Sequence, residues 1–164
     1  MTRTFEPAQA PEPAQAPEPA QAPERSRAPE PVERLVIVVD QDLPLGHLAN
    51  AVAVAGLIVG ATMPHLLGAE LKDADGRTHT GTYTTGLPVL RADREELGRI
   101  CARAVEHGLG LCEFPAVAQT TNSYDELTEL VAALPTEKLE RAAIAVYGTR
   151  KTVNSLTGSL PLLR

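Results

Sequence analysis

Two polar side chains stand near the start of a long apolar segment, where a helix is expected to follow the first strand. His47 carries an imidazole, which can give and take a proton near neutral pH, so it is our candidate acid or base. Asn50 follows about one helical turn later, and its amide could hold an amide or carbonyl group of a ligand. The alternatives are an exposed helix residue for His47 and a bond from Asn50 to a neighbouring loop.

A second polar run follows a later predicted strand and offers hydrogen-bond donors and acceptors without a strong nucleophile. Its members are Gln119, Thr120, Thr121 and Asn122. We predict that Thr120 joins His47 and Asn50 as a catalytic residue that positions a substrate, and that Gln119 and Thr121 contact the ligand. The alternative is that two neighbouring threonines in a loop only stabilise a turn.

A third group lies where the last predicted strand gives way to a helix. Free backbone N–H groups at a helix start, together with Arg150 and Lys151, could receive an anion. The run lacks the first glycine and the full spacing of a P-loop, so a nucleoside triphosphate site is not indicated. We therefore predict Tyr147, Gly148 and Lys151 as ligand-binding residues, with a solvated helix start as the alternative.

The remaining candidates indicate neither a metal ion nor a cofactor. Asp40 and Asp42 could bind a cation, but no third ligand stands at a suitable spacing, so a turn is the favoured interpretation. Cys101 and Cys112 lie eleven residues apart, without C-x-x-C spacing and without a histidine cluster. We predict that both are reduced packing residues.

The composition argues against a nucleic-acid-binding protein. The 164 residues suit one domain, and their net charge of −6 has the wrong sign for holding phosphates. Aromatic residues make up only 3% and tryptophan is absent, so few rings are available for stacking on bases. A small basic patch is expected at Arg150 and Lys151, with Arg91 and Arg94 beside it. We expect no strong nucleic-acid binding.

The first 32 residues have the composition of an extended, disordered tail. Glu6–Pro23 consists of three identical Glu-Pro-Ala-Gln-Ala-Pro repeats, and the prolines remove the donors that a helix or sheet needs. The tail is either a spacer or a ligand for a polyproline-binding groove. It has no apolar signal region, and the longest near-continuous apolar run, Leu48–Ala61, spans fourteen positions. We expect a cytoplasmic protein without membrane contact.

The rest of the chain, residues 33–164, alternates between strand and helix patterns. Capping sequences at Asp93 and Ser123 mark two helix starts, and a helix packed almost all round is expected at His47–Ala61. Glu70–Gly86 is expected to form a hairpin or an irregular excursion. The predicted strands are Leu35–Val39, Leu87–Leu90, Leu109–Phe114 and Ala142–Tyr147, and the last helix is Thr149–Leu156.

This alternation predicts a single-domain α/β sandwich with a central mixed, mostly parallel four-stranded sheet flanked by helices. In such sheets the working groups gather beyond the carboxyl ends of the strands. Here those ends lead into residues 40–50, 115–122 and 147–154. We therefore expect all three polar groups to meet at one edge of the sheet.

Several stretches are similar to the type II peptidyl-tRNA hydrolase superfamily, and more closely to its uncharacterised bacterial branch, the DUF-two-thousand domain family. The principal ones are Leu35–Gly46, Val89–Leu97 with His107–Leu109, and Val146–Gly148 with Val153–Leu160. The branch is further supported by Asp73–Gly76, Tyr147–Gly148 and Leu156–Leu160. The resemblance implies a peptidyl-tRNA hydrolase II-like fold over almost everything from Glu33 onward.

The chain departs from the active hydrolases of that superfamily at two motifs. Their lysine-rich turn reads Gly46–Asn50 here and contains no lysine, and their Asp-Ala-Gly-Arg-Thr segment reads Pro115–Thr120, with Ala116 for the acid and Gln119 for the arginine. The resemblance implies a hydrolase-like protein acting on an aminoacyl or related ester, with standard peptidyl-tRNA hydrolysis doubtful. The alternative is a non-catalytic module that binds a small molecule or peptide, as a monomer or a homodimer.

Overall fold

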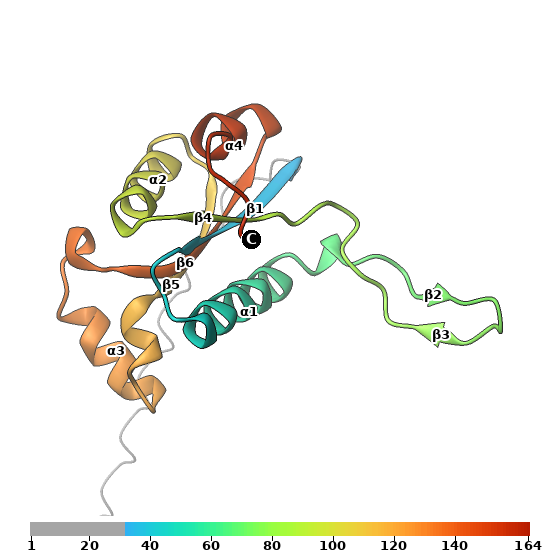
Figure 1. Cartoon of the computed structure of the whole chain (residues 1–164), viewed down its shortest axis with the longest axis horizontal. Helices are drawn as coiled ribbons and strands as arrows, with labels where there is room; N and C mark the ends of the chain where they lie inside the picture. The colour runs from blue at the N-terminus through green and yellow to red at the C-terminus, as the bar shows by residue number, and fades with distance from the viewer. Residues whose placement is uncertain (1–31) are drawn as a thin grey trace, which may run out of the picture.

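Residues 32–164 are described by a computed structural model, and residues 1–31 of the predicted tail, which spans 1–32, lie outside the described residues (Figure 1). Val32, which the composition assigns to the tail, packs against one hydrophobic core. The backbone N–H of Glu33 then donates to the carbonyl of Gly148 at 3.1 Å. The ordered packing therefore includes Val32.

Four strands form the main sheet, in the spatial order β4-β1-β6-β5. They are β1 (Arg34–Asp40), β4 (Val89–Ala92), β5 (Gly110–Pro115) and β6 (Arg141–Gly148). β1 pairs in parallel with β4, whereas β6 runs antiparallel to both β1 and β5. The expected mixed sheet is confirmed, but the expectation that it is mostly parallel is wrong, because only one of the three pairings is parallel.

The direction of β6 follows from the route of the chain after β5. That connection contains the short 3-10 helices η2 (Ala116–Gln119) and η3 (Thr136–Lys138), with α3 (Tyr124–Ala132) between them. A parallel strand would require a crossover across a face of the sheet. Because α3 packs on η2 instead of on a sheet face, β6 re-enters beside the end of β5, where Arg141 pairs with Pro115.

Helices cover both faces of the sheet and create two separate cores (Figure 1). The helix α1 (Leu45–Thr62) packs on one face, and α2 (Arg94–Glu106) and α4 (Arg150–Thr157) pack on the other. Alternate residues of β1 serve the two cores, since Ile37 belongs to the first and Val38 to the second. β1 is therefore buried on both faces, as its continuous β-branched run predicts.

Side-chain caps define the helix starts that the sequence predicts. Asp93 and Ser123 accept hydrogen bonds from the backbone N–H groups of Glu96 and Glu126, at 2.8 and 3.2 Å. Each cap satisfies a donor that has no partner within its helix. Gly108, at φ +63°, lies just beyond the end of α2, in the left-handed region that favours glycine. Local chemistry thus sets these boundaries.

The expectation that the first helix is packed almost all round is wrong. Only Ala51, Ala55 and Val59 of α1 are buried, against the sheet, while Leu45 is 82% and Leu57 73% exposed. When a helix is apolar on every side, its sequence does not indicate which face is covered. Among the described residues α1 is the one helix long and apolar enough to cross a membrane, with a mean hydropathy of 1.6 over 18 residues. The fourteen-residue run in the sequence understates this length.

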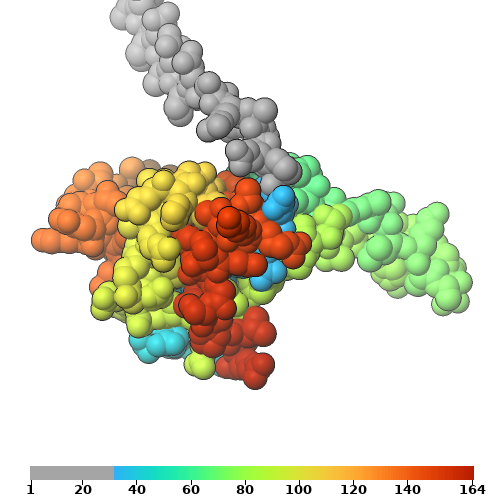
Figure 2. All heavy atoms as spheres, turned by 90° about the horizontal axis from the view of Figure 1, so that it is seen from above, coloured from blue at the N-terminus to red at the C-terminus, as the bar shows by residue number. Residues whose placement is uncertain are grey.

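The expected hairpin is present and projects from the body as an arm, defined here as residues 67–83 (Figures 1 and 2). It contains β2 (Leu71–Lys72) and β3 (Thr78–His79), follows the 3-10 helix η1 (Pro64–Leu66), and closes at a bridge between Leu67 and Tyr83. Its two sides approach so closely that a Cβ on Gly81 would lie 2.0 Å from the Gly68 carbonyl oxygen. Glycine is therefore required at the root.

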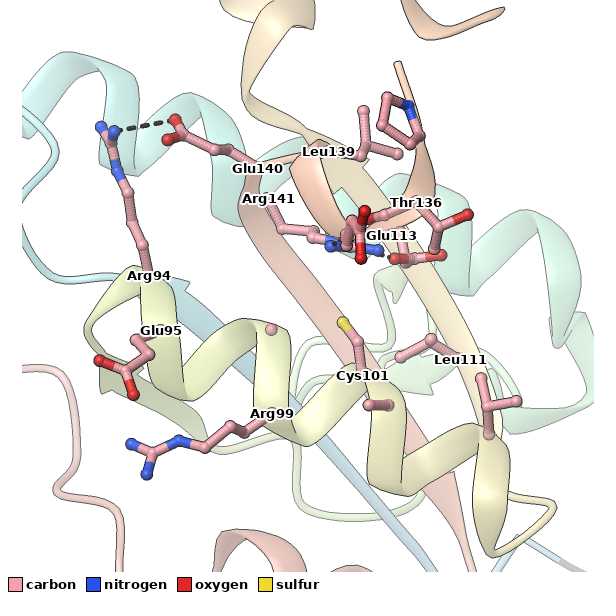
Figure 3. A pocket seen from close by; sticks show the side chains of 15 residues that line it. Arg94, Glu95, Arg99, Cys101, Leu111, Glu113, Thr136, Leu139, Glu140 and Arg141 are labelled. Atoms are coloured by element: carbon pink, nitrogen blue, oxygen red, sulfur yellow. Dashed lines mark hydrogen bonds and ion pairs between the residues drawn. The ribbon is translucent and has the colours of Figure 1, made fainter.

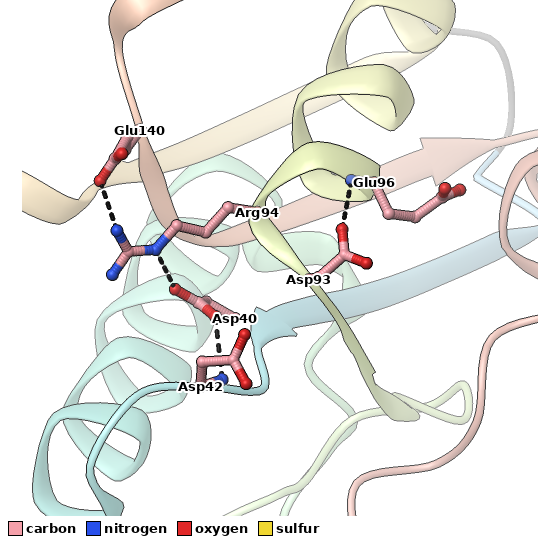
Figure 4. A network of polar contacts seen from close by, with 6 residues as sticks. All are labelled: Asp40, Asp42, Asp93, Arg94, Glu96 and Glu140. Carbon is pink, nitrogen blue, oxygen red and sulfur yellow. Dashed lines mark hydrogen bonds and ion pairs between the residues drawn. The ribbon is translucent and has the colours of Figure 1, made fainter.

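The end of β1 is anchored by a buried carboxylate. Asp40 is fully buried; its oxygens accept from the Arg94 Nε at 2.8 Å and from the Asp42 backbone N–H at 2.9 Å (Figure 4). The Arg94 guanidinium also donates to Glu140, at 2.8 Å. These bonds raise the pKa of Arg94, first through the Asp40 hydrogen bond and then through the charges of Glu140 and Asp40. The network ties α2 and the segment before β6 to the central strand.

We predict that Arg94→Met destabilises the protein by about 2 kcal/mol, because it leaves the Asp40 carboxylate buried without its ion-pair partner. This is below the cost for a fully buried pair, since the Arg94 side chain is 51% exposed. Arg99→Met is the matched control on the same helix, where the exposed pair with Glu96 should contribute about 0.5 kcal/mol or less. Urea unfolding measures both, and equal midpoints would contradict the prediction.

Candidate functional site

Two of the three predicted polar groups meet at one edge of the sheet. β1 and β5 both run antiparallel to β6, so their carboxyl ends share that edge. The side-chain Nε2 of Gln119 donates to the backbone carbonyl of His47 at 2.7 Å, which holds η2 against the start of α1. His47, Asn50, Gln119, Thr120 and Thr121 therefore belong to one neighbourhood, as the sequence predicts.

The third group lies at the opposite edge, so the expectation that Tyr147, Gly148 and Lys151 join the same site is wrong. Gly148 pairs with Arg34 at the beginning of β1, because β6 runs in the reverse direction. Tyr147 is half-buried with its ring against Gly110, and this burial raises its pKa.

The start of α4 is already partnered within the chain. A carboxylate oxygen of Glu33 accepts from the Arg150 backbone N–H at 2.9 Å, and the Thr149 hydroxyl caps the Thr152 N–H at 3.3 Å. These contacts fit the solvated helix start, because they occupy two of the N–H groups that an anion would need. Arg94 is bound to Asp40 at the other edge, so it does not extend a basic patch around Arg150.

The threonine hydroxyls at the shared edge are used by their own turn. Thr120 donates to the carbonyl of Val117 at 2.9 Å, and Thr121 donates to that of Ala118 at 3.4 Å. No side chain among residues 32–164 hydrogen-bonds the His47 imidazole, and His47 and Asn50 are both exposed. The turn interpretation of the two threonines fits these contacts, and no activated nucleophile is assembled there.

A cleft of about 950 Å³ opens beside these residues, between α1, β5, η2 and α3. We call it the α1–α3 cleft. Its apolar lining includes Val54, Ile58, Phe114, Pro115, Ala118, Leu127 and Val131. Its polar lining comprises Asn50, Glu113, Thr121, Asn122, Ser123, Tyr124 and Thr128. Within residues 32–164, no lysine, arginine or histidine lines it.

The far wall of the cleft is α3, which contains no buried residue. Leu127 and Val131 are one turn apart on the face toward the cleft, and Val54 and Ile58 have the same spacing on α1. These four apolar residues were not among the predicted site residues, because helical spacing of apolar residues is also what a core helix shows. The helical spacing is visible in the sequence and predicts an apolar helix face, but it does not indicate whether a core or a cleft lies against that face.

A second cavity, of about 870 Å³, lies on the α2 side and is lined by α2, β5 and the segment before β6 (Figure 3). Some of its charged groups pair with one another: Arg141 donates to Glu113 at 2.8 Å and to the Thr136 carbonyl at 3.3 Å, and Arg94 donates to Glu140. Cys101 projects from α2 toward them, and burial together with the Glu113 charge raises its pKa to about 12. Glu95 and Glu137 also line this cavity and make no ion pair within residues 32–164, so its free charge is acidic. It offers no thiolate.

A metal centre has no ligand set in the part of the chain that the structure describes. No group of three or more His, Cys, Asp or Glu side chains comes together in residues 32–164. The Asp40 carboxylate makes an ion pair and closes a turn onto Asp42. Its two oxygens serve the fold, which agrees with the turn interpretation of this pair.

The family whose model is described as "Protein of unknown function (DUF2000)" matches residues 33–164. The chain belongs to this family. No curated protein matches it. Among solved structures, a protein of unknown function from Agrobacterium tumefaciens str. C58, Atu0240, is similar with a TM-score of 0.73 and 17% identity. The match covers 80% of this chain and 97% of that chain.

At this identity the structural likeness shows the fold alone. The DUF2000 match confirms the predicted DUF-two-thousand family, but neither comparison ties the chain to the type II peptidyl-tRNA hydrolase superfamily. The overall α/β fold is shared with the solved Agrobacterium chain. Neither description assigns an activity. The function must therefore be argued from the cleft and its neighbouring residues.

We predict that neither cysteine reacts with Ellman's reagent in the native protein at pH 8. The thiolate is the reactive form, and burial raises the pKa of Cys101 to about 12 and also raises that of Cys112. Both thiols are free and buried, so both should be titrated after unfolding in guanidinium. One thiol reacting within seconds in native protein would contradict the assignment of both as packing residues.

Proposed function

We propose that this protein is a binding module, and that the α1–α3 cleft holds a neutral, largely apolar small molecule or peptide segment. The observation that carries this proposal is the cleft lining, which combines apolar walls with a few uncharged polar groups. Ligand sites commonly have this character, with most of the contact area apolar and a small number of polar groups that fix orientation.

The charges around the cleft support a neutral ligand over an anionic one. The one carboxylate in its described lining belongs to Glu113 and is paired with Arg141. No lysine, arginine or histidine of residues 32–164 lines the cleft to hold phosphate or carboxylate. The chain as a whole carries a net charge of −6. A nucleic acid or a nucleotide would therefore meet repulsion here instead of the cationic contacts that such ligands require.

The polar groups that remain suit an amide or carbonyl. Asn50 presents both a donor and an acceptor at the α1 wall, and no side-chain hydrogen bond to a described residue uses its amide. The backbone N–H of Asn122 is held by the Glu126 carboxylate at 3.2 Å, which fixes the loop between η2 and α3. A peptide group or a simple amide fits this pairing of donor and acceptor.

The second candidate is an ester hydrolase on a type II peptidyl-tRNA hydrolase-like fold, with His47 as acid or base. The Gln119 bond to the His47 carbonyl favours it, because the bond brings η2 beside the imidazole-bearing turn. The occupied threonine hydroxyls and the absent lysine and acid of the superfamily motifs count against it. An aminoacyl ester would be the substrate class on this alternative.

We predict that Thr128→Trp abolishes ligand-induced stabilisation. Thr128 is exposed on the cleft face of α3, so a tryptophan there would fill the cleft without displacing a core residue. A thermal-shift screen of N-acetylated apolar amino-acid amides and short apolar peptides should raise the melting temperature of the wild-type protein. Glu129→Trp, on the same helix but outside the lining, is the matched control and should keep the shift. The same shift in both variants would exclude the cleft.

We predict that purified protein does not hydrolyse aminoacyl esters or peptidyl-tRNA faster than buffer alone does. Among residues 32–164, no nucleophile is hydrogen-bonded to a general base near His47. Release of the amino acid from an aminoacyl p-nitrophenyl or methyl ester measures this directly. Turnover that falls by a hundredfold or more in His47→Ala would instead establish the hydrolase, since removal of a catalytic acid or base commonly has an effect of that order.

A further inference from the structure

The outward side of α1 is an apolar row that nothing in the described residues covers. Every fourth residue along the helix belongs to it: Leu45, Ala49, Ala53, Leu57 and Ala61. All five are exposed, and the helix carries no charged residue in its 18 positions. Solvent-facing helix sides normally carry charge, and a continuous exposed apolar row marks an interaction surface. We call these residues the outer row.

The arm likewise has little of the described chain to pack against. Among residues 32–164 its strands pair only with each other, and every residue from 69 to 80 is exposed. A lone two-stranded hairpin is marginal in water, so a projecting one needs something to pack against. Asp73 organises its tip by accepting from the backbone N–H groups of Asp75 and Arg77 at 3.0 and 2.9 Å. Leu67 and Leu71, about half exposed, supply an apolar surface.

We propose that two copies of this chain associate about a two-fold axis, with the arm of each lying on the outer row of the other. The row and the arm belong to the same molecule and lie next to each other along the chain, since α1 leads through η1 into the arm. A two-fold axis that passes near the arm root places the arm of each copy over α1 of the other copy. Such an interface is self-complementary: each surface meets the element that it lacks.

The areas favour the two contacts acting together. A helix of 18 residues is about 27 Å long and about 10 Å wide, so the outer row offers roughly 300 Å² in projection. A stable interface removes about 800 Å² from each partner. The row alone is too small, and the reciprocal contact of the partner's row with this copy's arm roughly doubles the area that each copy buries. A small residue at Ala49 and Ala53 allows the partner backbone to approach closely.

This interface is distinct from the α1–α3 cleft. The row of α1 that faces the sheet is Ala51, Ala55 and Val59, and the row that lines the cleft is Asn50, Val54 and Ile58. Each residue of the cleft row directly follows a residue of the outer row in the sequence, so the two rows lie on different sides of the helix. Association through the outer row therefore leaves the cleft open. A failure of dimerisation would not affect ligand binding, and the reverse also holds.

The first experiment compares Leu57→Glu with Val105→Glu by sedimentation equilibrium. Both residues lie on exposed helix sides, at 73% and 69%, so neither glutamate disturbs a core. The wild-type protein and Val105→Glu should have twice the mass of the 17.4 kDa chain, whereas Leu57→Glu should sediment as a single chain. Equal behaviour of the two variants would overturn the proposal.

The second experiment tests the arrangement of the copies. A Leu71→Cys chain is mixed with an Ala53→Cys chain and oxidised, while the native Cys101 and Cys112 remain buried. We expect a mixed covalent dimer, at least tenfold more abundant than in a mixture of Leu71→Cys with Val105→Cys. Equal yields would exclude the arm-on-row contact. A wild-type protein that stays a single chain would overturn the proposal, and its cosedimentation with phosphatidylcholine vesicles would then assign the outer row to a lipid surface.

Discussion

The antiparallel pairing of β1 with β6 is the constraint on which the rest of the structure depends. It buries both strands between two helical layers, and it decides which loops share an edge. Because β5 also opposes β6, the ends of β1 and β5 meet, and the end of β6 points away from them. The Asp40–Arg94 pair then holds α2 at the end of β1, because the buried Asp40 carboxylate would be strongly destabilising without an ion-pair partner.

The same topology explains why the α1–α3 cleft at this edge is lined mainly by apolar side chains. The chain between β5 and β6 does not cross the sheet, so α3 is left to pack on η2 with its apolar side facing α1 across a gap. A crossover helix would have buried Leu127 and Val131 in a core. Held apart from the sheet, they line a cleft instead, and the acidic chain places no cation there. The binding proposal rests on this geometry.

Local features were predictable from the sequence because local chemistry determines them. The caps at Asp93 and Ser123, the hairpin and the buried strand Leu35–Val39 depend on neighbours within a few residues. Strand direction was not predictable, because a short apolar run has the same pattern in either orientation. The misplacement of Tyr147, Gly148 and Lys151 followed from that single error. His47, Asn50 and Gln119 do lie at the same edge of the sheet, because β1 and β5 run in the same direction.

The helix α1 is apolar on every side, so its hydrophobic periodicity does not predict which side is buried. The different rows of the helix each explain part of this apolarity. A helix that served only the sheet would need one apolar row and would carry charge elsewhere. In α1 the second row forms the cleft wall, and the outer row remains equally free of charge. Charge on the outer row would cost nothing in a monomer and would improve solubility. The proposed association of two copies through that row would account for the absence of charge, which neither the sheet nor the cleft explains.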